Sequence, residues 1–195
     1  MNIFDEKIVL GFGPVILRPI SIEDIPLLQN IVYDEDTWKL NVNKISDDTD
    51  LNDFVSKSVE YLEKKIKYTF LVFDKRKRCA AGCTSFLNIS EKDKRLEIGG
   101  TWLSKDYRGK GINKLCKFLL LRFVFEELNY ERVEFKTDVL NIRSRKAMLK
   151  IGAVEEGTLR SHTLMHNGRR RDTIYYSILR NEWAEIKPKI FSEYL

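Results

Sequence analysis

The chain has 195 residues, 43% of them hydrophobic and 32% charged, with a net charge of +5. This length is enough to bury the core of one domain, so we expect a single domain over 1–195, with a core at about 15–183 and a tail at 184–195. No apolar run is long enough to span a membrane, and the first residues lack a signal-peptide pattern. We therefore expect a cytoplasmic protein that has no membrane partner.

The cysteines and histidines do not indicate a metal site. Cys79, Cys83 and Cys116 leave an odd thiol, and no histidine or further cysteine stands near them at metal-ligand spacing. We expect reduced, buried thiols. His162 and His166 also lack ligands at suitable spacing, and we expect both to face solvent on a hairpin.

The first half of the chain predicts a strand, two helices and an antiparallel meander. The predicted elements are a strand at 15–18, a helix at 22–32 capped by Ser21 or Asp24, a helix at 51–66 capped by Asp50, and strands at 68–73, 79–89 and 96–103. Apolar residues recur at spacings of three and four in the helices, which is typical of one buried face. Short charged turns separate the three later strands, which favours antiparallel pairing.

The second half continues as an α/β chain. The predicted elements are a helix at 114–129, a strand at 133–139, a helix from Asn141 to Gly152, strands at 154–165 and 170–179, and a helical tail from Glu182 interrupted at Pro188. Because a whole helix separates 96–103 from 133–139, these two strands can be parallel neighbours. Asn167-Gly168 is a strong hairpin signal between the last two strands.

The segment 107–113, with the sequence YRGKGIN, is the strongest candidate for a ligand site. It stands between a predicted strand and a predicted helix, where glycines let the backbone approach an anion and unpaired amides stabilise it. Arg108 and Lys110 add positive charge. A triphosphate P-loop is excluded, because Ser104 and Gly111 stand where that motif needs Gly and Ser or Thr. A dinucleotide fingerprint is only half present, because its last glycine is missing.

Charge is distributed unevenly along the chain. Residues 21–60 contain ten acidic residues and three lysines, a local charge of −7, which leaves +12 for the rest. This predicts a basic half for a polyanionic ligand, whereas the acidic half either attracts a cationic ligand or forms ordinary solvated helix faces. Basic clusters at 143–150 and 169–171 raise the alternative of RNA or ribosome contact. No RNA-binding motif supports it, so we do not expect a nucleic-acid partner.

The order of these elements and four short motifs resemble the GNAT superfamily of acetyl-CoA-dependent N-acetyltransferases. The motifs are EIGGTWL at 97–103, RGKG at 108–111, NIRS at 141–144 and GAVEEGTLR at 152–160. They are similar to motifs of the branch that contains the Rim-type N-terminal acetyltransferases of ribosomal proteins. The similarity extends from about Val15 to Trp183. The resemblance implies a mixed α/β fold, with a mostly antiparallel central sheet, splayed parallel strands and helices on both faces.

The resemblance also implies how acetyl-CoA binds. The implied cofactor-binding residues are Trp102, Leu103, Arg108, Gly109, Lys110, Gly111, Ile112, Asn113, Asn141, Ser144 and Arg145. In the family the loop amides hold the pyrophosphate, and the strand before the loop pairs with pantetheine and offers an amide to the developing oxyanion. Asn113 departs from the small residue usual in the family, and we expect altered loop geometry with binding retained. Asn141 is a helix cap, a cofactor contact or both, and Arg145 lies near the 3′-phosphate.

The implied chemistry is direct attack of a neutral amine on the thioester. An α-amino group, with a pKa of about 7.7–8.0, needs less help than a lysine near 10.4. The resemblance assigns the base to Glu97, and the alternative is an ordinary sheet charge or an ion pair with Arg95 or Lys105. Met148 stands where many relatives carry a tyrosine acid. Ser144 is therefore the candidate acid, or else an ordinary first-turn helix hydroxyl.

Family architecture implies that the acidic residues Asp34, Glu35 and Asp36 lie near the acceptor entrance. They predict cationic acceptors such as basic protein N-termini, polyamines or aminoglycosides. We expect an N-acetyltransferase that uses acetyl-CoA and a primary amine of a peptide, a protein N-terminus or a small molecule. The alternative is a non-catalytic module of the same fold that binds CoA or an RNA–protein surface. The sequence is compatible with a monomer or a homodimer.

Overall fold

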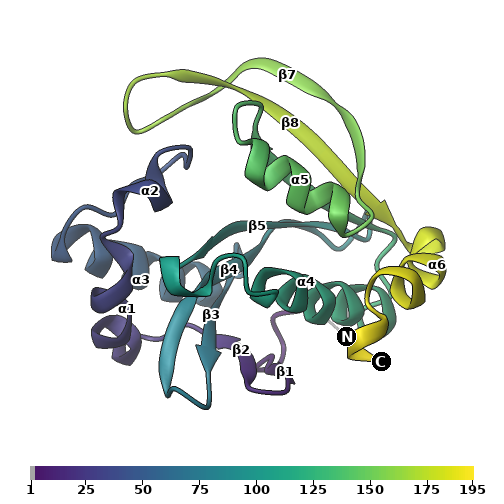
Figure 1. Ribbon diagram of the computed structural model, residues 1–195, viewed down its shortest axis with the longest axis horizontal. Helices are drawn as coiled ribbons and strands as arrows, with labels where there is room; N and C mark the ends of the chain where they lie inside the picture. The colour runs from purple at the N-terminus through teal and green to yellow at the C-terminus, as the bar shows by residue number, and fades with distance from the viewer. Residues whose placement is uncertain (1–2) are drawn as a thin grey trace.

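The computed structural model describes residues 3–195. Eight strands within this range form one sheet (Figure 1). The strands are β1 Leu10–Phe12, β2 Val15–Pro19, β3 Tyr68–Asp74, β4 Cys79–Ser90, β5 Arg95–Leu103, β6 Arg132–Asp138, β7 Val154–Leu164 and β8 Arg170–Leu179. They lie in the order β1-β2-β3-β4-β5-β6-β8-β7. Neighbouring strands are antiparallel except β5 and β6, which are parallel. The predicted mixed, mostly antiparallel sheet is confirmed.

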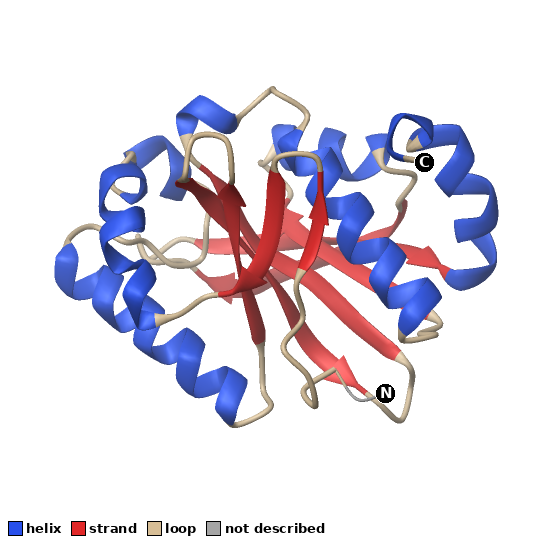
Figure 2. Ribbon diagram, turned by 90° about the horizontal axis from the view of Figure 1, so that it is seen from below, coloured by secondary structure: helices blue, strands red, loops and turns tan. Residues whose placement is uncertain are grey.

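Helices cover both faces of this sheet (Figure 2). They are α1 Ile25–Val32, α2 Glu35–Trp38, α3 Asp48–Glu63, α4 Ile112–Arg122, α5 Ile142–Lys150 and α6 Arg180–Ile190, with short helical turns η1 Ile22–Asp24, η2 Lys105–Tyr107, η3 Phe123–Glu127 and η4 Ser192–Tyr194. Helices α1 and α3 pack in one core cluster with Leu71 and Trp102 of the sheet. Helices α4, α5 and α6 pack in another, with Phe70 and Leu103. Because consecutive strand residues point to opposite faces, the two clusters lie on opposite faces of the sheet.

The structure corrects several predicted boundaries. The cap of α3 is Asp47, whose carboxylate accepts a hydrogen bond from the Asp50 amide at 2.9 Å, so Asp50 is not the cap. The helix predicted at 114–129 is α helical only to Arg122, because its next turn widens into the π-helical η3. Pro188 lies inside α6 without interrupting it, since it stands in the last turn, where one lost amide hydrogen bond has little effect. Strand β1 and helix α2 were not predicted, because both are too short to show a period.

The candidate site lies where β5 and β6 separate. Their pairing ends with Glu97 opposite Glu134, and β6 pairs with β8 along its other edge. The register between β4 and β5 shifts just beyond this point, beside Gly100, whose φ of 57° fits a bulge. The bulge bends β5 away from β6. The predicted splay between two parallel strands is therefore present, and α4 begins beyond the far end of β5.

Candidate active site

The loop between β5 and α4 exposes a row of backbone donors. Gly109 and Gly111 have φ values of 74° and 79°, a left-handed conformation that glycine adopts without a steric penalty. Among residues 3–195, none accepts a hydrogen bond from the amides of 109–113. These amides open the first turn of α4, where the helix dipole also favours an anion. The loop therefore has the geometry of an anion site.

The Arg108 side chain turns away from these amides and fixes the loop to α2. Its Nε donates to the Leu103 carbonyl at 2.9 Å, and its Nη2 contacts the Asp34 carboxylate at 2.9 Å and the Thr37 hydroxyl. Burial opposes ionisation of Asp34, but Thr37 and Arg108 outweigh it and lower the pKa of that carboxyl. Arg108 thus supports the loop structurally, and Lys110 remains exposed without an ion pair in the described chain.

Three buried polar atoms near the loop lack a hydrogen-bond partner among the described residues. They are Trp102 Nε1, Ser104 Oγ and Asn113 Oδ1. A buried polar atom without a partner is costly, so such atoms call for a ligand or water to satisfy them. Asn113 lies in the first turn of α4, next to the free amides. Its Oδ1 is therefore an acceptor that a ligand donor at the loop would satisfy.

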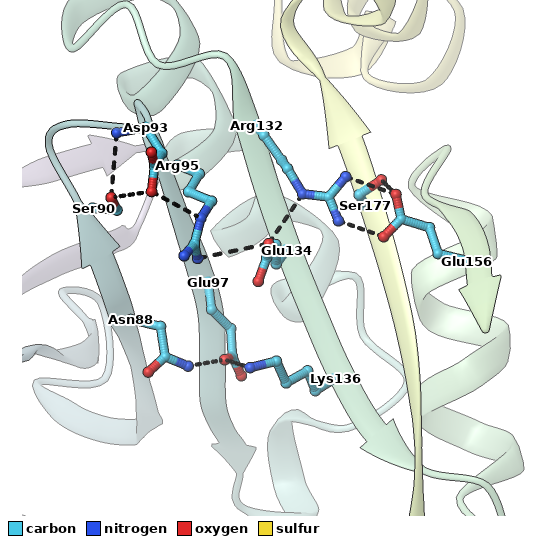
Figure 3. Close-up of polar contacts among 10 residues, drawn as sticks. All are labelled: Asn88, Ser90, Asp93, Arg95, Glu97, Arg132, Glu134, Lys136, Glu156 and Ser177. Carbon is cyan, nitrogen blue, oxygen red and sulfur yellow. Dashed lines mark hydrogen bonds and ion pairs between the residues drawn. The ribbon is translucent and has the colours of Figure 1, made fainter. Parts of the chain in front are cut away.

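Glu97 sits at the point where the two strands part (Figure 3). Its flanking residues Leu96 and Ile98 pack toward α4, so Glu97 points to the opposite face. Glu97 is 6% exposed, and its carboxylate accepts a hydrogen bond from Asn88 Nδ2 at 2.7 Å and pairs with Lys136 Nζ at 2.8 Å. The ion-pair partner is therefore Lys136 on β6. The predicted alternatives, Arg95 and Lys105, are not its partners.

Local geometry explains how Glu97 keeps this position. A Cβ built on Gly99 would lie 2.7 Å from Glu97 Oε1, so a larger residue there would push the carboxylate out of this position. Burial alone would lower the pKa of Lys136, but the hydrogen bond and charge of Glu97 outweigh it and raise that pKa. The pair is thus a fixed carboxylate and a firmly charged ammonium at the mouth of the opening.

On the other face, α4 places a lysine beneath the opening. Lys117 is 6% exposed, and its Nζ donates to Thr101 Oγ1 at 2.8 Å and lies 5.9 Å from the centroid of the Phe135 ring. Thr101 is on β5 beyond its last residue paired with β6, and Phe135 directly follows the paired segment of β6. Burial lowers the pKa of Lys117 from 10.5 to about 8.

Helix α5 begins beside the far end of β6. The Asn141 side chain caps it by accepting a hydrogen bond from the Ser144 amide at 3.0 Å, so the predicted cap is confirmed. Ser144 is half-buried in the first turn, with no partner for its hydroxyl among the described residues. Arg145 donates to the Val139 carbonyl and the Tyr176 hydroxyl, each at 3.2 Å, and is therefore held internally. Met148 is buried in the core and donates nothing.

The acidic residues of α2 meet the tip of the β7–β8 hairpin, which arches toward α2 (Figure 1). The His166 amide donates to the Val42 carbonyl at 2.9 Å, and its ring contacts the Trp38 carbonyl at 3.2 Å. A pocket of about 320 Å³ lies between these elements, lined among others by Glu35, Asp36, Lys44 and His166. Asp34 is separated from them by its bond to Arg108. Both histidines are exposed, as predicted.

The observed groups fit an extended thioester cofactor. The loop amides suit a pyrophosphate, the unpaired edges of β5 and β6 suit a peptide-like arm, and the orphaned polar atoms lie along the same strand and loop. No cluster of three or more His, Cys, Asp and Glu side chains within 3–195 is arranged to hold a metal ion. No helix within that range is long and apolar enough to cross a membrane.

Comparison with known proteins defines the class. Residues 15–154 match the family model described as an acetyltransferase (GNAT) domain, so the chain belongs to the GNAT acetyltransferase family. It is 38% identical over 102 residues to YdaF of Bacillus subtilis (strain 168), which carries the provisional name ribosomal N-acetyltransferase. That match covers 52% of this chain and 55% of YdaF, so the chain spans about half the length of this relative.

Solved structures show the same fold. An acetyltransferase of provisional assignment from T. thermophilus is 28% identical, with a TM-score of 0.85 over 96% of this chain and 97% of that chain. The ribosomal-protein-S5-alanine acetyltransferase from Vibrio fischeri is 21% identical, with a TM-score of 0.75 over 90% and 98% of the two chains, and shows likeness of fold alone. The predicted resemblance to the GNAT superfamily and its ribosomal branch is confirmed.

Sequence reasoning missed Lys117, Thr101 and Lys136. A lysine inside the apolar run of α4 was the available signal for Lys117, since a charged residue on a buried stripe needs an explanation. No signal in the sequence pointed to Lys136, because its contact with Glu97 depends on the register between β5 and β6.

Proposed function

We propose that this protein transfers the acetyl group of acetyl-CoA to a primary amine by direct attack in a ternary complex. The observation that carries the proposal is the opening between β5 and β6, which ends at a loop whose amides 109–113 have no acceptor in the described chain. Membership of the GNAT family supports the same chemistry. The acceptor is the α-amine of a peptide or protein N-terminus, or a small-molecule amine.

Glu97 is the proposed base, directly or through water. It is fixed by Asn88 and Lys136 at the start of the opening, on the face that carries α1 and α3. An amine must be neutral to attack, and a carboxylate is a weak base. It therefore suits an α-amine with a pKa of about 7.7–8.0 better than a lysine near 10.4, which is about 3–4 kcal/mol harder to deprotonate.

The first turn of α5 is the proposed second contact of the cofactor. Ser144 has a free hydroxyl there. The Asn141 side chain caps the same end of the helix, and we propose that it contacts the cofactor while it keeps this hydrogen bond. Contact between Arg145 and the 3′-phosphate would require this side chain to exchange its internal partners for the phosphate. Trp102 and Leu103 remain the proposed strand contacts of the pantetheine arm.

The acidic start of α2 is proposed to attract a cationic acceptor. Glu35 and Asp36 are exposed and line the pocket beside the hairpin tip, whereas Asp34 is already paired with Arg108. Neutralising Glu35 and Asp36 together is expected to raise the acceptor KM in low salt, since steering by exposed charges is screened by ions. An unchanged KM would remove their role. The free thiols of Cys79, Cys83 and Cys116 fit the reducing cytoplasm, where we place the protein.

The first test is calorimetric titration of the protein with acetyl-CoA, followed by an assay for thiol release with an α-amino peptide. We expect one-to-one binding in the micromolar range and thiol release that depends on the amine. Binding without release for any amine tested would favour the non-catalytic, CoA-binding alternative. Absence of binding at millimolar acetyl-CoA would overturn the proposal.

A further inference from the structure

Lys117 is a buried cation for which the fold provides no anion. The residue is 6% exposed, and among residues 3–195 its single hydrogen bond goes to the neutral Thr101 hydroxyl. Thr101 in turn contacts the Thr84 hydroxyl at 2.8 Å, so the nearest polar partners are uncharged. An ammonium has three donors, and burial without partners is costly. This arrangement therefore requires an explanation beyond packing.

The titratable groups that bear on Lys117 do not neutralise it. On α4, burial raises the pKa of Cys116 to about 12, so its thiol is neutral near pH 7. On β5, Glu97 lies on the opposite face of the sheet and is paired with Lys136. β6 presents the Phe135 ring to Lys117. Burial is therefore the largest influence on Lys117 and lowers its pKa, and the charge of Glu97 offsets this effect only in part.

The position of Lys117 shows what this cation can serve. Of its two contacts, Phe135 directly follows the last residue of β6 that pairs with β5, and Thr101 lies on β5 four residues beyond Glu97, where the strands have separated. Asn113, four residues earlier on α4 and so on the same helix face, carries an orphaned buried oxygen. Two unsatisfied polar groups on one helix face, below the opening and beside the free loop amides, point to the same ligand.

We propose that Lys117 is the acid that protonates the departing thiolate of CoA. This inference rests on the proposed acetyl transfer. The nitrogen–carbon bond forms as the carbon–sulfur bond breaks, and sulfur leaves with the bonding electron pair. The Lys117 ammonium gives its proton to sulfur and becomes a neutral amine. The proton lost by the attacking nitrogen passes to Glu97 or water, and Lys117 regains a proton from solvent before the next turnover.

The acid strength of Lys117 suits this role better than that of the other candidate. A pKa of about 8 is close to that of an ordinary thiol, about 8.5, so proton transfer to the thiolate is nearly isoenergetic. Most of the lysine is still protonated at pH 7. The Ser144 hydroxyl is neutral and a much weaker acid, and Met148 has no proton to give.

The test compares Lys117→Met with Lys114→Met on the same helix. The control removes a lysine whose ammonium pairs with Glu193 at 2.5 Å near the C-terminus, away from the opening. We expect the rate of the parent to fall above about pH 8, and we expect Lys117→Met to lower kcat about 10²-fold or more and to abolish that fall. Lys114→Met should leave both unchanged. Calorimetric titration with acetyl-CoA shows whether either variant still binds.

A second readout does not depend on turnover. CoA is bound to each protein, and its thiol is titrated by the ultraviolet absorbance of the thiolate. Because a nearby cation favours the thiolate, we expect the pKa of the bound thiol to be higher by about one unit or more in Lys117→Met than in the parent. The control variant should match the parent.

The outcomes separate this inference from the proposed function. In one outcome, the parent binds acetyl-CoA and transfers the acetyl group, and Lys117→Met has the same kcat, the same fall in rate at alkaline pH (the alkaline limb) and the same thiol pKa as the parent. Lys117 is then not the acid, while the proposed acetyl transfer stands. If kcat falls but the alkaline limb and thiol pKa are unchanged, Lys117 acts through packing and the proposal is also overturned. If the parent does not bind acetyl-CoA, both proposals fail together.

Discussion

The two lysines on either side of the β5–β6 opening differ in one respect, the presence of an anion. Lys136 faces Glu97 at 2.8 Å, and its pKa is raised despite burial. Lys117 faces Thr101 and an aromatic ring, and its pKa falls to about 8. The same side chain is therefore a fixed positive charge on one face of the sheet and a titratable acid on the other.

The difference follows from the composition of the two faces. On the Lys136 face, charged side chains form a connected network, in which Arg132 bridges Glu134 and Glu156 and Arg95 approaches Glu134 at 3.8 Å (Figure 3). On the Lys117 face, α4 packs apolar residues against the sheet. A partner anion decides the charge state where one exists, and desolvation decides it where none exists.

The strongest test of the paired side is Lys136→Met. It leaves the Glu97 carboxylate buried with only the Asn88 amide, so we expect a loss of about 3–5 kcal/mol in the free energy of unfolding. Urea denaturation measures the loss. The double variant Glu97→Gln with Lys136→Met should recover most of it, because no buried charge is left alone. A double variant no more stable than Lys136→Met would show that the pair does not carry this stability.

Glu97→Gln tests catalysis on the same side. We expect kcat to fall about 10²-fold with unchanged affinity for acetyl-CoA, because the amide cannot accept the amine proton. Steady-state kinetics and calorimetric titration measure the two quantities. Glu134→Gln is the matched control, one strand away and paired with Arg132 at 3.0 Å. Equal kcat in the parent and in Glu97→Gln would reduce Glu97 to a structural ion pair.

Lys117→Met is expected to act in the opposite direction on stability. The folded-state pKa of about 8 lies below the ordinary 10.5, so the charged lysine destabilises the fold fully below about pH 8. The variant should gain about 1–3 kcal/mol at pH 7. Between these two pKa values the unfolded chain binds more protons, so parental stability rises with pH and the gain shrinks. Urea denaturation across that range tests the sign, and a gain independent of pH would contradict it.

The smallest expected effect concerns the glycine loop between β5 and α4. Gly111→Ala places a Cβ at a φ of 79°, which costs about 1–2 kcal/mol and should also weaken acetyl-CoA binding. Gly13→Ala, at a φ of 56° in the β1–β2 turn, is the control with similar strain and no loop contact. Calorimetry should show weaker binding for Gly111→Ala alone. Equal affinities in both variants would remove the loop from the cofactor site.

Local patterns in the sequence were sufficient for several features. Period and turn residues predicted the meander and the Asn167-Gly168 hairpin, and Asn141 is the helix cap that its residue type indicated. The glycine loop was also predicted correctly as a turn before a helix, because positive φ is a property of the residue itself. These features depend on residues close together in the chain.

Contacts between distant segments were decided only by the tertiary structure. The partner of Glu97 is Lys136, 39 positions away, since the register of β5 against β6 sets which side chains meet. The same register leaves Lys117 facing Thr101 without an anion. Sequence alone therefore determined most of the elements, the loop and the family, but not β1, α2 or the π-helical turn after α4. Tertiary packing decided which charges are paired, because pairing and desolvation depend on what other segments bring to each face.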